Sequence, residues 1–191
     1  RADMTRYELF LRETRTYEII EDVKNFRSEI GVLFLNGYNR DVLTKMFDDN
    51  RLTYTSLFKA RPHIFVSKSN PLAKHKVVSL EDLEDFPYLS YDQGIHNSFY
   101  YSEEILSQIP HKKSIVVSDR ATLFNLLIGL DGYTIATGIL NSNLNGDNIV
   151  SIPLDIDDEI DIVYLKHEKA TLSKMGEKFL DNLVKEVTFD N

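Results

Sequence analysis

The sequence predicts an α/β fold in which strands and helices alternate along two lobes. A continuous apolar run at 30–35 lacks alternation, which favours a strand covered on both faces, as in a parallel sheet. Apolar residues at helical spacing come before and after that run, and the same order returns in the second half of the chain. With 191 residues, 42% of them hydrophobic, the chain can bury its core as one domain or as two small lobes.

The first fifty residues predict a strand, a helix, the buried strand and a second helix. We expect the first strand at 7–11, followed by a polar turn whose last residue, Thr16, caps the next helix. Apolar residues at helical spacing place that helix at 17–26, and a second helix covers 42–47.

A long extended segment at 52–67 leads into the second lobe. Pro62 lies inside it, so an edge position or a crossing between sheets fits better than a central strand. Ser79 and Asp82 then form an approximate capping box for a short helix, and the next strand is expected at 87–91.

The next predicted elements alternate again. We expect a helix at 98–109 and a short strand at 114–117. Leucines at i, i+3, i+4 and i+7 predict a helix over 123–130, which Gly132 closes before a strand at 133–136.

The last part of the chain returns to strand and helix. A polar, asparagine-rich loop at 141–148 precedes a strand at 159–165. A terminal helix begins at Thr171, and its apolar face consists of Leu172, Met175, Phe179, Leu183 and Val184.

Composition excludes several classes of function. The chain carries 30 acidic and 22 basic residues, and its net charge of -8 disfavours contact with DNA. It contains no cysteine, which excludes disulfides, thiolate metal sites and thiol redox sensing. No apolar run approaches the length of a membrane span, and the first residues do not resemble a signal peptide, so we expect a cytoplasmic protein without membrane contact.

Three motifs carry a resemblance to a known family. They read RETRTYEIIEDVKNFRSEIGVLFL, then NPLA with VSLEDLEDFPYL after it, and finally VSDRATLFNLLIGLDGYTIATGIL. Their order and spacing resemble the effector-binding domain of LysR-type transcriptional regulators. Thr14 stands where that family usually has glycine, and Asn70 stands where histidine is common.

The resemblance implies two Rossmann-like subdomains joined by two crossover strands, similar to type II periplasmic binding proteins. Subdomain I would comprise 1–60 with 161–191, and subdomain II would comprise 61–160. By this resemblance, we expect this sequence to start after the family's first strand and helix. By the same resemblance, the domain forms a homodimer or homotetramer, with the helices near Ile20 and Phe99 as candidate interfaces. DNA would be contacted only through a winged helix-turn-helix that the sequence lacks.

Ligands of open α/β sheets bind at the carboxyl ends of strands, where helix N-termini present free N–H groups. Hydroxyl and amide groups there suit a small effector such as a carboxylate or similar anion. Asp92 and Asp119 would repel an anion, so either they turn away or the effector is cationic or polar. The alternative is that Thr16 and Ser118 only cap helices and that Gly138 only serves a turn. The candidate ligand-binding residues are Thr14, Thr16, Ser90, Tyr91, Gln93, Ser118, Thr137 and Gly138.

Neither catalysis nor a cofactor is expected. The sequence lacks G-x-S-x-G, a P-loop, G-x-G-x-x-G and H-E-x-x-H, and its five histidines lack metal-ligand spacing. The aromatic run at 99–101 is expected to fill a core or an interface, and the acidic run at 155–159 is expected to be a solvated turn. Two alternatives of the same fold stay open, a free-standing solute-binding protein and a lyase.

Overall fold

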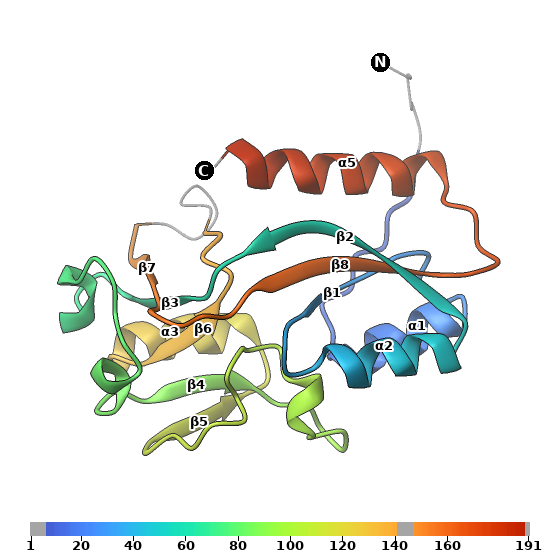
Figure 1. Cartoon of the computed structure of the whole chain (residues 1–191). Coiled ribbons are helices and arrows are strands. Elements are labelled where there is room, and N and C mark those ends of the chain that lie inside the picture. Colours follow the sequence, from blue (N-terminus) through green and yellow to red (C-terminus); the bar gives the residue numbers. More distant parts are fainter. Residues whose placement is uncertain (1–6, 141–146, 190–191) are drawn as a thin grey trace.

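The computed structural model describes residues 7–140 and 147–189, which fold into two β-sheets with helices packed on them (Figure 1). One sheet has three strands in the order β1-β8-β2, and the other has five strands in the order β5-β4-β6-β3-β7. We call the first sheet with α1, α2 and α5 the first lobe, and the second sheet with α3 the second lobe. The expected α/β fold of two lobes is confirmed.

The first lobe is an antiparallel sheet with helices on both sides (Figure 1). Helices α1 and α2 cover one face, and α5 lies on the opposite side. Its core lies between the sheet and α1 and α2, and includes Ile20, Leu35, Phe47 and Leu165. The elements are α1 (Thr16–Lys24), β1 (Gly31–Leu35), α2 (Arg40–Asp49), β2 (Leu52–Ala60), β8 (Ile160–His167) and α5 (Lys174–Phe189).

The second lobe is a mixed sheet whose two faces bury separate apolar clusters. Strand β4 runs parallel to β5 and β6, whereas β3 is antiparallel to β6 and β7. Leu123 and Leu127 of α3 pack with Leu89 on one face, and Ile64, Tyr88 and the segment around Ile105 fill the other. The elements are β3 (His63–Ser67), β4 (Tyr88–Tyr91), β5 (Ser114–Val117), α3 (Arg120–Gly129), β6 (Tyr133–Ala136) and β7 (Ile149–Pro153).

Two neighbouring chain segments cross between the lobes (Figure 1). Strand β2 ends at Ala60 in the first sheet, and β3 begins at His63 in the second. Pro62 lies between them, where it lacks an N–H to donate and its carbonyl accepts from the N–H of Leu154 on the returning segment at 3.0 Å. The crossing predicted at Pro62 is therefore confirmed.

The strand predicted at 7–11 is wrong. The backbone there forms neither strand nor helix, and Phe10 and Leu11 are 81% and 78% exposed. A strand needs a partner for its N–H and C=O groups, and none of the described strands pairs with this segment.

The strand predicted at 30–35 is confirmed as β1, but the prediction that it lies in a parallel sheet is wrong. Strand β1 pairs with β8 alone in the described part of the chain, and the pairing is antiparallel. Its residues alternate between buried and half-buried, because only one face is packed against α1 and α2. The parallel arrangement is instead found at β4, β5 and β6.

Two local predictions fail for identifiable reasons. The helix expected at 98–109 is reduced to one 3-10 turn at Phe99–Tyr101, since Leu106 has a φ of 62° that no α-helix accommodates. Residue Asp131, with a φ of 51°, makes the left-handed turn after α3 that we expected at Gly132. Gly132 serves a close approach instead, because a Cβ there would lie 3.0 Å from Leu89.

The remaining predictions differ mainly at the ends of elements. The capping box is confirmed, since Ser79 N–H donates to Asp82 at 2.8 Å and Asp82 N–H donates to Ser79 Oγ at 3.3 Å. Strand β7 was not predicted. Most of the loop predicted at 141–148 lies outside the described residues, and the terminal helix starts at Lys174 instead of Thr171.

Candidate ligand-binding cleft

The carboxyl ends of the three parallel strands lie along one edge of the second sheet. Tyr91 at the end of β4 pairs with Val117 at the end of β5, and the N–H of Asp92 donates to the carbonyl of Val117 at 2.8 Å. Because β6 runs parallel to β4, its end at Ala136 points the same way. The predicted residues Ser90, Tyr91, Ser118, Thr137 and Gly138 are therefore distributed along this edge.

An open pocket of about 900 Å³ lies between the start of the first lobe and the loop that follows β4. Thr14 and Gln93 line it, so two of the predicted residues, one from each half of the chain, come together. The other six predicted residues do not line this pocket. The lining consists of Arg12, Glu13, Thr14, Arg15, Tyr17, Glu18, Glu21, Asp22, Arg27, Gln93, Gly94, Ile95 and His96.

Two ion pairs connect the lobes beside this pocket. Arg15, the residue before α1, contacts Asp92 through Nη2 and Oδ2 at 2.7 Å, and its Nε donates to the Asp92 carbonyl at 3.0 Å. Arg120, the first residue of α3, donates from Nε to Oε1 of Glu13 at 2.9 Å. Each lobe thus supplies one arginine and one carboxylate, and we call Arg15–Asp92 and Arg120–Glu13 the crossed ion pairs.

Residues 92–104, which we call the strap, reinforce the contact between the lobes through their aromatic side chains. His96 stacks on Tyr17 of α1 with ring centroids 3.5 Å apart, and Tyr100 stacks on Tyr38 with centroids 4.8 Å apart. Tyr101 packs against the core of the first lobe, so the expectation that the run at 99–101 fills a core or an interface is confirmed for Tyr100 and Tyr101 but is wrong for Phe99, which is 53% exposed.

The strap returns to the second lobe at Glu104, which is 4% exposed. One carboxylate oxygen of Glu104 accepts the N–H of Tyr91 at 2.7 Å, and the other has no partner among the described residues. Burial raises the pKa of Glu104 to about 8 and that of Tyr91 to about 12. Gln93 is also buried, and its Nε2 donates to Glu103 at 3.1 Å.

The helix caps differ from those expected. Thr16 is the first residue of α1 and is buried, while Arg15 occupies the N-cap position, from which its side chain makes no capping bond to the helix backbone. Asp119 caps α3 by accepting the N–H of Thr122 at 2.9 Å, whereas Ser118 is exposed. The alternative that Thr16 and Ser118 cap their helices is therefore wrong.

Gly138 has a conformational reason to be glycine. Its φ is 81°, in the left-handed region, and a Cβ there would lie 2.5 Å from Nδ1 of His63. The hydroxyl of neighbouring Thr137 accepts the N–H of Ile139 at 3.5 Å.

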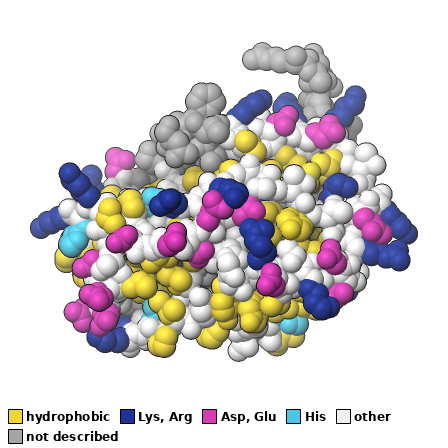
Figure 2. Space-filling view, viewed as in Figure 1, with side chains coloured by type: hydrophobic (Ala, Val, Ile, Leu, Met, Phe, Trp, Pro, Cys, Tyr) yellow, Lys and Arg dark blue, Asp and Glu magenta, His cyan; other side chains and the backbone are white. Residues whose placement is uncertain are grey.

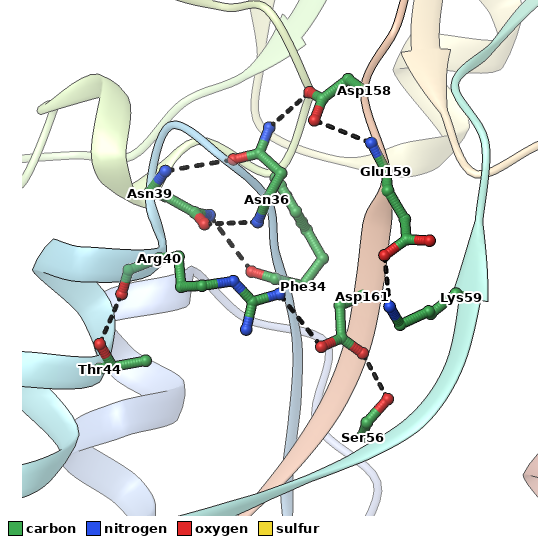
Figure 3. Close-up of polar contacts among 10 residues, drawn as sticks. All are labelled: Phe34, Asn36, Asn39, Arg40, Thr44, Ser56, Lys59, Asp158, Glu159 and Asp161. Atoms are coloured by element: carbon green, nitrogen blue, oxygen red, sulfur yellow. Dashed lines mark hydrogen bonds and ion pairs between the residues drawn. The ribbon is translucent and has the colours of Figure 1, made fainter.

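A second polar cluster joins the end of β1 to the point where β8 enters the first lobe (Figure 3). Asp161 is buried, and it accepts from Arg40 of α2 at 3.2 Å and from the hydroxyl of Ser56 on β2. Nδ2 of Asn36 donates to Asp158 at 3.0 Å. One carboxylate of the acidic run at 155–159 thus holds the crossover in place. The run is therefore more than the solvated turn that we expected.

Changing Asp161 to asparagine is expected to lower the free energy of unfolding by about 1–3 kcal/mol, because a buried hydrogen-bonded charge pair loses one charge. Urea unfolding followed by circular dichroism measures the change. Glu159→Gln is the matched control, since its pair with Lys59 is exposed on both sides and contributes little to stability. Equal losses in the two variants would contradict the role given to Asp161.

The family described as LysR substrate binding domain matches residues 1–188, so the chain belongs to that family. The family is that of transcriptional regulators. Among the described helices, none is both long and apolar enough to span a membrane. No curated protein matches the chain.

Solved structures of the same family share the fold. The C-terminal domain of a probable LysR family regulator from Rhodococcus sp. RHA1 is 15% identical with a TM-score of 0.65, over 96% of this chain and 87% of that one. The effector-binding domain of QuiR, in complex with shikimate, is 18% identical with a TM-score of 0.60, over 90% and 78%. The effector-binding domain of BenM with its effector benzoate is 19% identical with a TM-score of 0.60, over 92% and 76%.

The chain is shorter than whole regulators of this family. It spans 59% of a putative LysR family regulator and 58% of HinK, both from Pseudomonas aeruginosa, which are each 16% identical to it with TM-scores of 0.60 and 0.61.

Proposed function

We propose that this chain is the effector-sensing part of a LysR-type transcriptional regulator, which binds a small molecule between its lobes. The observation that carries the proposal is the open pocket between the lobes, bordered by the crossed ion pairs and by the carboxyl edge of the second sheet. QuiR and BenM, whose effector-binding domains share the fold, have been crystallised with shikimate and benzoate.

The lobes divide at the two crossings, with 1–60 and 161–191 in subdomain I and 61–160 in subdomain II. Ligand binding would change the angle between them, and a differential affinity worth about 1–3 kcal/mol is enough to shift the balance of two conformations. We propose that Thr14 and Gln93, which line the pocket, contact the ligand directly, and that Ser118 lies with the residues around them. Thr16, Ser90, Tyr91, Thr137 and Gly138 would shape the site around them.

DNA would be contacted by a winged helix-turn-helix outside this sequence. On the face shown in Figure 2, lysine and arginine side chains are interspersed with acidic ones and form no basic patch, which supports this division of roles. The regulator would act in the cytoplasm as a homodimer or homotetramer, without catalysis and without contact with a membrane.

A thermal-shift screen of amino acids, aromatic acids and sugars tests the proposal. We expect at least one compound to raise the melting temperature of the chain, because a ligand that binds only the folded state stabilises it. Mass spectrometry should recover that compound unchanged after incubation. Conversion of the compound would indicate a lyase or another enzyme, and a screen without any stabilising compound would contradict the proposal.

A further inference from the structure

We propose that the effector is a zwitterion, a small molecule with one carboxylate and one ammonium group, that replaces the crossed ion pairs. The inference rests on the proposed function, since it names the chemical class of the ligand for the same cleft. It starts from the opposite orientation of the two pairs, because the first lobe supplies the arginine of one pair and the carboxylate of the other. The first lobe supplies Glu13 and Arg15, two residues apart, and the second lobe supplies Asp92 and Arg120.

The crossed ion pairs are accessible to a ligand and easy to displace. The side chains of Arg15 and Asp92 are 40% and 45% exposed, and those of Arg120 and Glu13 are 59% and 71% exposed. Pairs exposed to this degree contribute little to stability. A ligand with well-placed charges therefore loses little of its binding free energy by breaking them.

A ligand with only a negative charge finds no unpaired arginine among those that line the pocket. Arg12 and Arg27 both bind Asp22, and Arg15 binds Asp92. A simple anion would have to compete with these carboxylates for an arginine, and breaking the Arg15–Asp92 pair would leave Asp92 without its arginine as the cleft closes, which is unfavourable. A zwitterion avoids this penalty, because its ammonium group takes the position that the arginine leaves.

A buried acceptor beside the crossed ion pairs is an independent sign of a donor on the ligand. Gln93 lines the pocket and is 6% exposed, and its Oε1 has no hydrogen-bond partner among the described residues. Its Nε2 is already bonded to Glu103, so the amide is held with its acceptor free. Buried acceptors without a donor are rare. Because Oε1 has almost no accessible surface here, an ammonium N–H of the ligand would satisfy it only once the crossed ion pairs open.

The size of the pocket fits a ligand of this class. Sites for small molecules usually measure about 300–1,000 Å³, and the volume of about 900 Å³ lies within that range. A free amino acid or a simple derivative of one would fit and leave room for water.

Isothermal titration of the whole chain with matched compounds tests the inference. The panel contains the common free amino acids, their amides, which lack the negative charge, and their N-acetyl derivatives, which lack the positive charge. Simple carboxylic acids and sugars complete the panel. We expect at least one free amino acid to bind, and we expect its amide and its N-acetyl derivative to bind at least about tenfold more weakly, because each loses charge-assisted hydrogen bonds.

Two double variants test the positions without changing the net charge. Arg15→Gln with Asp92→Asn removes one crossed ion pair, and Glu13→Gln with Arg120→Gln removes the other. Each should weaken binding of the amino acid by at least about tenfold. The matched control is Lys45→Gln with Asp49→Asn, which neutralises an exposed pair on α2 and should leave the affinity unchanged. Circular dichroism shows whether each variant is folded.

The possible results separate this inference from the proposed function. Binding of a singly charged or neutral compound with no binding of any free amino acid would overturn the zwitterion and leave the sensing function intact. Equal affinity for an amino acid and its amide or N-acetyl derivative would do the same, as would unchanged affinity in both folded double variants. No binding by any compound of the panel would count against both proposals.

Discussion

Replacing Glu104 with glutamine is expected to stabilise the chain increasingly as the pH rises from about 4.5 to about 8. Burial of the Glu104 side chain raises its pKa from the ordinary value of 4.5 to about 8. Between these values the folded chain keeps a proton that the unfolded chain releases, so the free energy of unfolding falls as the pH rises. Glutamine removes this loss and can still accept the N–H of Tyr91.

The size of the effect follows from the pKa difference. One pKa unit corresponds to about 1.4 kcal/mol. The loss of unfolding free energy that the glutamine variant avoids at pH 8 is therefore on the order of 4 kcal/mol. Below pH 4.5 both states are protonated, and wild type and variant should converge. Urea unfolding at pH 4.5, 6 and 8 measures the difference. The control Glu81→Gln changes an exposed glutamate and should show no such trend, whereas a Glu104→Gln variant less stable than wild type at pH 8 would refute the expectation.

Phe47→Ala is expected to lower the free energy of unfolding by about 3–5 kcal/mol, because it removes a large side chain from a packed core and leaves a cavity. Phe47 is completely buried between α2 and the first sheet, in the same cluster as Ile20 and Leu165. The first sheet has only three strands among the described residues, so few other core residues compensate for the loss.

Urea unfolding followed by circular dichroism measures the change at Phe47. The matched control is Val42→Ala on the same helix, whose side chain is 38% exposed and whose loss should change the free energy by no more than about 0.5 kcal/mol. If both variants lost the same small amount, α2 would not pack on the sheet as described.

The parts of the fold that sequence predicted are those specified by local patterns. Strands β4, β5 and β6 appear as short apolar runs between polar turns, and the leucine pattern at 123–130 predicted α3, which contains three of the four leucines. Pro62 predicted the crossing because its missing N–H is a local property. Each of these signals lies within a few residues of the element it specifies.

The failures concern segments whose structure depends on distant residues. Whether 7–11 forms a strand depends on a neighbouring strand, and the apolar content of the segment does not show whether such a neighbour is present. The segment at 98–109 contains enough apolar residues for a helix. In the structure Tyr101 packs on the first lobe, while Glu104 binds the backbone of Tyr91.

The site was predicted in outline only. Gln93 lines the pocket after the end of β4, as the rule for the carboxyl ends of strands predicts, whereas Thr14 lines it although the strand expected before it does not form. Arg15 and Arg120 were missed, although both flank predicted helix starts, because their partners are 77 and 107 residues away along the chain. The stacking of His96 on Tyr17 has no sequence signal for the same reason.

The distance between the lobes is the most direct test of the account. The chain has no cysteine, so Asp48→Cys on α2 and Asn125→Cys on α3 place one spin label on the exposed surface of each lobe. Pulsed electron paramagnetic resonance should show a distance distribution that shifts and narrows when a stabilising compound from the thermal-shift screen is bound. A distribution that stays the same while the compound is demonstrably bound would contradict a sensor that works by moving its lobes.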